Sequence, residues 1–135
     1  MGIFSKRKRP APSLRINCIT REVIETISES AKDVHPLEFA GALKARGDVI
    51  DEVVLIPGTI SGDEHAILRL YHLPPNLSVV GSVHSHPSPY ATPSDADLQL
   101  FGNFGRVHII MAEPYDMHSW RAYNSRGQEI VLEVV

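Results

Sequence analysis

Hydrophobic positions at helical spacing follow a short alternating stretch near the start of the chain. Residues 14–18 alternate as a short strand, and Thr20 is then well placed to cap the N-terminus of a helix. The apolar side chains of that helix fall on one face: Val23, Ile24, Ile27 and Ala31. We expect the helix to end near Val34, because Pro36 disfavours helical geometry at His35.

Apolar stretches separated by turn residues predict that the rest of the chain forms mainly strands. Gly47-Asp48 indicates a hairpin, and a second helix is expected to begin near Ser94 and to stop at Gly105. The stretch 77–86 is apolar enough to be a strand buried on both faces. The expected strands cover residues 38–46, 49–58, 65–72, 77–86, 107–113, 119–124 and 129–135. Together with two helices they predict an α/β fold with a mixed, largely antiparallel sheet.

Length and composition are those of an ordinary globular protein. The chain has 135 residues, 43% hydrophobic and 21% charged, which fits one domain. Its single cysteine, Cys18, excludes a disulfide framework and a cysteine-rich zinc site, and we expect it to be buried in the first strand. No apolar stretch approaches the roughly 20 residues that span a bilayer, and the N-terminus lacks the pattern of a signal peptide. We therefore expect a cytoplasmic protein that does not bind membranes.

Charge is distributed unevenly along the chain, whose net charge is −3. The first residues carry a group of cations and no acidic residue: Lys6, Arg7, Lys8, Arg9 and Arg15. This basic start could bind an acidic partner or nucleic acid, but its composition favours a flexible segment over residues 1–13, followed by one domain over residues 14–135. The rest of the chain is acidic, so binding to nucleic acid is not expected.

Two histidines stand at the end of the apolar stretch 77–86. His84 and His86 are two residues apart, so in a strand their side chains point to the same face and can reach one metal ion about 2 Å from each nitrogen. Pro87 favours an extended conformation at His86. Alone, this spacing is a weak signal for a metal, because short motifs have many chance matches.

Asp97, in the first turn of the second predicted helix, is the candidate third ligand. Two imidazoles and one carboxylate leave one tetrahedral position for water, which is the composition of a catalytic zinc site rather than a structural one. A purely structural explanation also exists. Ser94 and Asp97 fit a capping box, and Asp95 and Asp97 would favour the helix dipole.

A zinc hydrolase also needs a group that moves protons and a donor that stabilises the oxyanion. Glu38 is the candidate for proton transfer, although an exposed glutamate on an edge strand is the simpler interpretation of this position. Ser94 could donate its hydroxyl to a carbonyl oxygen. The signatures of nucleobase deaminases and of H-E-x-x-H metalloproteases are absent from the sequence.

Glu38, His84-x-His86-Pro87 and Ser94-x-x-Asp97 together resemble the JAMM (MPN+) metalloprotease family, which includes deubiquitinating isopeptidases. The resemblance covers residues 14–135 in the family's order of elements. It implies a cytidine-deaminase-like fold and one zinc ion with a catalytic water. The family's ligands would be His84, His86 and Asp97, with Glu38 as the proton shuttle and Ser94 as the oxyanion donor.

The resemblance also implies a substrate, the extended C-terminal Gly-Gly tail of a ubiquitin-like protein joined to lysine. An exposed strand edge could bind such a tail by β-addition. The short spacing between Asp97 and residues 107–113 leaves no room for large insertions and indicates a minimal enzyme of broad selectivity. Two alternatives stay open: release of an amino acid or peptide from the C-terminus of a sulfur-carrier protein, and a non-catalytic MPN scaffold.

The remaining histidines have no partner at ligand spacing. His35 could orient the Glu38 segment, although a role in the turn before Pro36 is the preferred interpretation. Surface or hydrogen-bonded core positions are expected for the others: His65, His72, His108 and His118.

Overall fold

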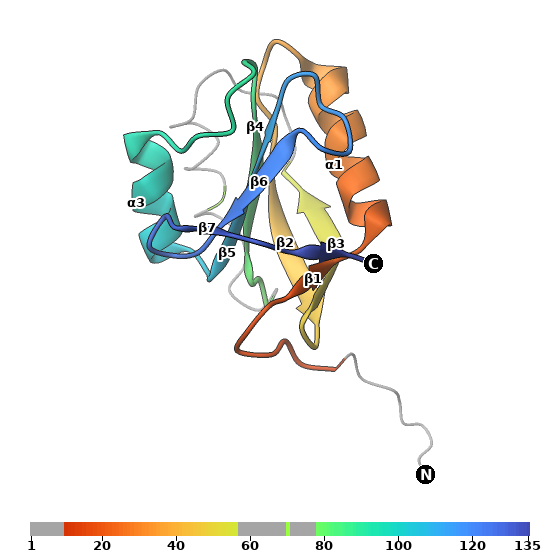
Figure 1. The fold of residues 1–135 in the computed structure, drawn as a ribbon, viewed down its shortest axis with the longest axis vertical. Helices are drawn as coiled ribbons and strands as arrows, with labels where there is room; N and C mark the ends of the chain where they lie inside the picture. Colours follow the sequence, from red (N-terminus) through yellow and green to blue (C-terminus); the bar gives the residue numbers. More distant parts are fainter. Residues whose placement is uncertain (1–9, 57–69, 71–77) are drawn as a thin grey trace.

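A computed structural model of the chain describes residues 10–56, Leu70 and residues 78–135. This part of the chain contains mainly strands, with helix α1 after the first strand and helix α3 after the fourth (Figure 1). They are β1 (Cys18–Ile19), α1 (Arg21–Val34), β2 (Ala40–Arg46), β3 (Val49–Leu55), β4 (Gly81–His86), α3 (Asp95–Asn103), β5 (Val107–Ala112), β6 (Trp120–Tyr123), β7 (Glu129–Ile130) and β8 (Glu133–Val134).

The strands form one mixed sheet in the order β7-β6-β5-β4-β2-β3-β1-β8. Antiparallel neighbours are β2 with β3, β2 with β4, β5 with β6, and β6 with β7. Parallel neighbours are β1 with β3, β1 with β8, and β4 with β5. The predicted mixed, largely antiparallel sheet with flanking helices is therefore confirmed, and β4 lies in its interior between β2 and β5.

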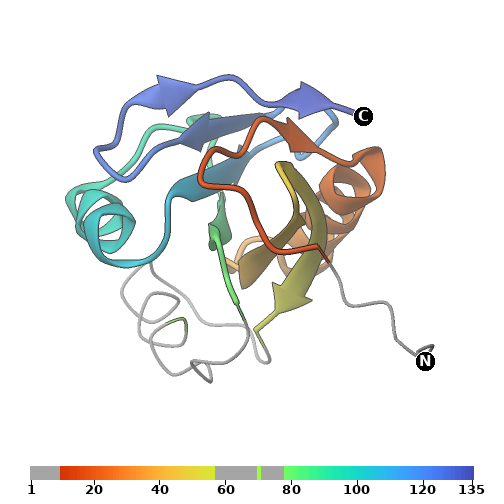
Figure 2. The same ribbon diagram turned by 90° about the horizontal axis from the view of Figure 1, so that it is seen from below.

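The sheet is strongly curled. β7 and β8 form its two opposite edges, yet only Val131 and Leu132 separate them in the chain. Because an extended chain advances at most about 3.6 Å per residue, the two edges must lie close together, and Figure 2 shows the strands bending around toward each other. The single strand predicted over residues 129–135 is therefore wrong: the chain leaves one edge at Ile130 and joins the other at Glu133.

Helices α1 and α3 cover opposite faces of the sheet (Figure 1). On one face, apolar side chains of α1 pack against the sheet in a cluster that includes Ile24, Ile27, Leu43, Val83 and Ile109. On the other face, α3 contributes to a second cluster that includes Leu100, Phe101, Ala40, Ala42 and Ile110. The even-numbered residues of β4 thus face α3, and its odd-numbered residues face α1.

The residues predicted to start and end α1 and to form the turn between β2 and β3 do so in the structure. The Thr20 hydroxyl accepts from the backbone N–H of Val23 at 3.2 Å, and the helix ends at Val34, followed by His35 at a non-helical ψ of 134°. Gly47 turns the β2–β3 hairpin at a φ of 58°, a conformation that favours glycine. β1 is shorter than the predicted strand over residues 14–18 and begins at Cys18, which is half-buried rather than buried.

Some predictions fall outside the described residues. These are the flexible segment at its positions 1–9, most of the strand over residues 65–72, and the ends of two other strands, at residues 57–58 and at residue 77. Residues 78–80 are described and have no strand geometry, so the strand predicted over residues 77–86 begins only at Gly81. Leu70 is described and has helical rather than strand geometry. Within residues 10–13, Pro12 forms a β-bridge with Gly47 and the Ser13 N–H donates to the Gly47 carbonyl at 2.7 Å. None of the described helices is both long and apolar enough to cross a bilayer.

His108 is a hydrogen-bonded core residue, as expected. It is fully buried on β5, stacks on Phe101 with ring centroids 4.4 Å apart, and places Nδ1 2.7 Å from the Ser82 hydroxyl. Burial lowers the pKa of His108 to about 4, with a smaller contribution from the charge of His84, against hydrogen bonds to backbone carbonyls. The imidazole is therefore neutral in the folded protein near pH 7.

We predict that stability falls as the pH drops from about 6.5 to about 4. In this range unfolded His108 binds a proton that folded His108 does not, so acid favours unfolding, by about 3 kcal/mol over the whole range. Urea unfolding in a chelator measures this slope. A double variant, Ser82→Ala with His108→Phe, removes both polar partners and keeps the stacking. Its stability should depend less on pH, and an unchanged slope would exclude His108 as the cause.

Candidate metal centre

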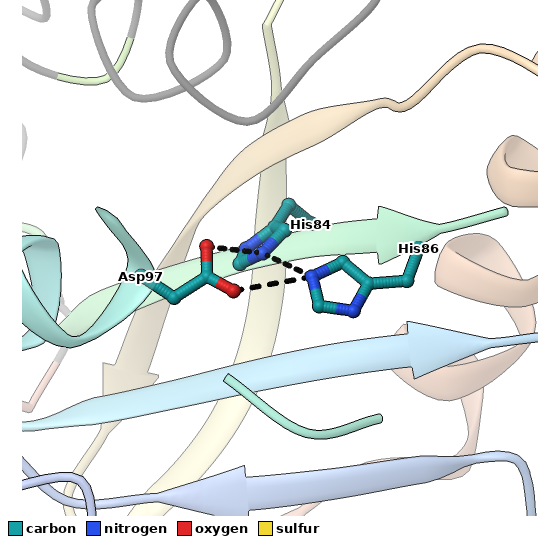
Figure 3. A group of neighbouring side chains, drawn as sticks. All are labelled: His84, His86 and Asp97. Atoms are coloured by element: carbon teal, nitrogen blue, oxygen red, sulfur yellow. Dashed lines mark hydrogen bonds and ion pairs between the residues drawn. The ribbon is translucent and has the colours of Figure 1, made fainter. Parts of the chain in front are cut away.

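Three predicted ligands converge where β4 ends and α3 begins (Figure 3). His84 and His86 project from the same face of β4, and Asp97 comes from the first turn of α3 on that face. Asp97 has no solvent exposure and His84 is 2% exposed, whereas His86 is partly open. Because β4 is hydrogen-bonded on both sides, the two histidines stand on a rigid part of the sheet.

The distances among the three side chains suit one metal ion. His84 Nε2 lies 2.9 Å from Asp97 Oδ1, His86 Nε2 lies 3.1 Å from Asp97 Oδ2, and the two Nε2 atoms are 3.2 Å apart. Zinc bonds of about 2.0–2.1 Å in a tetrahedron place neighbouring ligand atoms about 3.3 Å apart. The two histidine nitrogens stand at nearly this separation, and each has one oxygen of Asp97 at a similar distance. Among the residues that the structure describes, these three alone form such a group.

Hydrogen bonds outside the group orient two of the ligands. The Nδ1 atom of His86 lies 3.1 Å from the carbonyl oxygen of Tyr90, which favours a proton on Nδ1 and leaves Nε2 to bind a metal. The backbone N–H of Ser94 donates to Asp97 Oδ2 at 2.9 Å. Such outer contacts fix ligand orientation and tune metal affinity.

Asp97 is held in its ionised form. Burial alone would favour the neutral acid, but hydrogen bonds from His84 and His86, the nearby charge of His84 and the Ser94 N–H together hold the pKa of Asp97 well below its usual range. A buried carboxylate between two imidazoles can therefore offer a full negative charge to a cation at neutral pH.

Ser94 forms the capping box that the sequence predicted as the structural explanation. Its hydroxyl accepts from the Asp97 N–H at 3.1 Å while Asp97 accepts from the Ser94 N–H. A hydroxyl that accepts one hydrogen bond can still donate its own proton. The capping role and a role beside a metal are thus compatible, because the same box positions Asp97 toward the histidines.

Glu38 lies next to the strand that carries the two histidines. The antiparallel register pairs Ala40 with His84, and Phe39 is bound to Ser85 by two hydrogen bonds, from Phe39 N–H to Ser85 Oγ at 3.0 Å and from Ser85 N–H to the Phe39 carbonyl at 3.1 Å. β2 is an interior strand and Oε1 of Glu38 has almost no solvent access. An exposed glutamate on an edge strand is therefore the wrong description of Glu38.

Ser85 is a contributor that the sequence interpretation left unassigned. It is fully buried between the two histidine ligands, and its side chain points to the opposite face of β4. By binding Phe39, it fixes the chain directly after Glu38 to the ligand strand. Its position inside the H-x-H motif was the only signal available, and that signal does not specify a partner.

A narrow cleft lies at the same end of the sheet as His86. Its volume is about 210 Å³, and its lining comes from the loop after His86 and from the stretch between the end of β5 and the start of β6: Pro89, Tyr90, Ala91, Thr92, Ala112, Glu113, His118, Ser119, Trp120 and Arg121. A larger cavity of about 500 Å³ lies beside Val107. Val107 pairs with Gly81 at the start of β4, so that cavity is at the far end of the sheet from His86.

Comparisons with known proteins agree with this geometry. A model of prokaryotic homologs of the JAB domain matches residues 20–123, a range that contains Glu38, His84, His86, Ser94 and Asp97. A probable metalloprotease of Haloferax volcanii is 36% identical over an alignment of 127 positions, and the match covers 87% of this chain and 78% of that protein.

Two solved structures share the fold and much of the sequence. The crystal structure of a JAB1/MPN domain protein from Archaeoglobus fulgidus gives a TM-score of 0.71 at 41% identity, covering 89% of this chain and 98% of that chain. A structure of JAMM, described as a metalloprotease-like zinc site in the proteasome and signalosome, gives a TM-score of 0.72 at 42% identity over the same shares.

Proposed function

The chain belongs to the family of prokaryotic homologs of the JAB domain, the JAMM-type metalloproteases, and on that premise we propose that it is a zinc-dependent isopeptidase. The substrate would be a conjugate of ubiquitin or a ubiquitin-like modifier, cut after the C-terminal Gly-Gly. The observation that carries the proposal is the convergence of His84, His86 and Asp97 at ligand separations, with Glu38 fixed beside their strand. A location in the cytoplasm belongs to the same proposal.

In this mechanism His84, His86 and Asp97 hold one zinc ion. When bound, zinc supplies Lewis-acid activation that makes a water molecule nucleophilic near neutral pH. Glu38 would accept a proton from the attacking water and pass it to the leaving amine. The Ser94 hydroxyl donates a hydrogen bond to the oxygen that becomes negative as the amide carbonyl is attacked. Cys18 has no part in the mechanism, since β3 and β2 separate its strand from β4.

The small cleft at the His86 end of the sheet would suit a substrate tail of small residues. A volume of about 210 Å³ is below the range typical of drug-sized ligands, and a Gly-Gly tail brings no side chains into it. Pairing of the tail with a strand edge by β-addition is part of the proposal.

Release of an amino acid or peptide from a sulfur-carrier protein would use the same residues and is the alternative activity. A non-catalytic scaffold is disfavoured, because a purely structural domain has no need for three convergent ligands with a carboxylate kept ionised in the interior.

The experiment that tests the proposal is incubation of the purified protein with a set of Gly-Gly isopeptide conjugates and a C-terminally extended sulfur-carrier protein, with and without chelator. Chelator-sensitive release of free modifier from the isopeptide conjugates supports the proposal. Cleavage of the sulfur-carrier extension alone would favour the alternative. Release of nothing from any substrate by zinc-loaded protein would support the scaffold and contradict the isopeptidase.

A further inference from the structure

A second polar group, formed by His35, Tyr115 and Glu113, lies where the segment leading to Glu38 leaves α1. His35 Nδ1 lies 2.7 Å from the Tyr115 hydroxyl, and the two rings meet edge to face with centroids 5.5 Å apart. His35 Nε2 lies 3.7 Å from Glu113 Oε2. A carboxylate beside Nε2 favours a proton on that nitrogen, so Nδ1 accepts and the Tyr115 hydroxyl donates.

Tyr115 is firmly held in an unusual conformation. It is 5% exposed, and its φ of 62° lies in the left-handed region, which is costly for a residue with a large side chain. Its N–H donates to the Ala112 carbonyl at 2.8 Å, and its carbonyl accepts from the buried Ser28 hydroxyl on α1. The surrounding contacts therefore aim the phenol at His35 rather than letting it rotate into solvent.

The segment between His35 and Phe39 is fixed at both ends, with Glu38 inside it. At one end the His35 N–H donates to the Ala31 carbonyl and the Leu37 N–H to the Val34 carbonyl. At the other end Phe39 is bound to Ser85 on the ligand strand. Burial raises the pKa of Tyr115, and the charges of Glu113 and Glu38 add to the rise.

The segment that carries Tyr115 also contacts the metal-ligand side. Ala112 pairs with His86 in the β4–β5 register, and the Glu113 N–H donates to the Ser88 carbonyl at 2.8 Å in the loop after His86. One short stretch, residues 112–115, thus connects the chain before Glu38 with the chain after His86.

We propose that Tyr115 and His35 are positioning residues, whose hydrogen bond holds the segment carrying Glu38 at a fixed place relative to the ligands of β4. Displacement of a reacting group by about 1 Å can reduce a rate about 100-fold. A bond from a buried, conformationally fixed tyrosine to the residue that ends α1 would prevent such a displacement. Neither side chain takes part in the chemistry itself. The proposal rests on the proposed proton-transfer role of Glu38.

The test is Tyr115→Phe, which removes only the hydroxyl. In the zinc-loaded protein we expect kcat for a Gly-Gly isopeptide substrate to fall about 10-fold or more, with KM changed less than about twofold and zinc content unchanged. His35→Ala should give a similar loss, and the double variant should be no worse than either single variant, because both remove the same hydrogen bond. Additive losses would overturn the proposal.

Asp116→Ala is the matched control. Asp116 Oδ1 accepts from the His118 N–H at 2.9 Å and the Ser119 hydroxyl at 2.7 Å, so its loss weakens the same turn without touching His35. We expect Asp116→Ala to lower Tm by about 5 °C or less and to keep kcat. Equal losses of kcat in Asp116→Ala and Tyr115→Phe would mean that only the stability of the turn matters, and would overturn the proposal.

Hydrogen exchange separates this proposal from the proposed function. With zinc bound, the Leu37 and Phe39 amides should exchange faster in Tyr115→Phe than in the parent protein, while amides of β5 keep their rates. This readout needs no substrate. A parent protein without isopeptidase activity would contradict the proposed function only. Unchanged exchange rates at the Leu37 and Phe39 amides of Tyr115→Phe would contradict the positioning role.

Discussion

Glu38→Gln is expected to retain zinc and lose nearly all activity. Glutamine has almost the same shape as glutamate, but it cannot accept the proton of the attacking water. Removing a general base typically costs 10²- to 10⁴-fold, so kcat on a Gly-Gly isopeptide should fall by about that factor. Because Glu38 is not among the convergent ligands, zinc content should remain one per chain. Steady-state kinetics together with metal analysis measures both quantities.

Glu29→Gln provides the matched control, since it makes the same chemical change on the exposed side of α1. We expect wild-type kinetics from this variant. If Glu38→Gln cleaved as fast as the Glu29→Gln control, Glu38 would have no role in proton transfer, even if zinc binding at the proposed site were confirmed.

Asp97→Asn has the second large expected effect, and it acts on metal binding. The substitution removes the negative charge that His84 and His86 face, and it replaces one accepting oxygen with a donor that points at an imidazole or at the Ser94 N–H. Changes outside the ligand shell already weaken metal binding 10- to 100-fold. Loss of a ligand should therefore weaken zinc binding by more than about 100-fold and abolish the activity as well.

Asp95→Asn tests whether this effect belongs to the ligand or to the helix start. Asp95 is exposed in the same first turn of α3, so its replacement changes the charge near the helix N-terminus by the same amount. Competition with a zinc-binding dye should give wild-type affinity for Asp95→Asn. If both variants bound zinc equally well, Asp97 would not be a ligand.

Features that depend on neighbours in the sequence could be predicted. The spacing of His84 and His86 places both side chains on one face of any strand, and the Ser94-x-x-Asp97 box defines a helix start wherever it occurs. The end of α1 before Pro36 is equally local. These local rules determine most of the metal centre, because its parts come from one strand end and the next helix start.

Features that depend on the three-dimensional curl of the sheet could not be predicted from the sequence. The residues between Ile130 and Glu133 do not show that the chain crosses from one sheet edge to the other. The crossing depends on where β1 lies in space, because β8 pairs with β1 and β7 pairs with β6. Glu38 resembled an exposed edge residue, because nothing in the sequence around it shows that it leads into β2, an interior strand of the sheet. The contact of His35 with Tyr115 joins residues far apart in the chain and has no sequence pattern at all.

Zinc titration of metal-stripped protein, with cleavage of a Gly-Gly isopeptide conjugate as the readout, tests the central claim most directly. A site built from His84, His86 and Asp97 predicts no cleavage by the stripped protein, a rise in rate with added zinc, and saturation at one zinc per chain. Cleavage that persists in the stripped protein, or protein that binds one zinc and cleaves nothing, would contradict it.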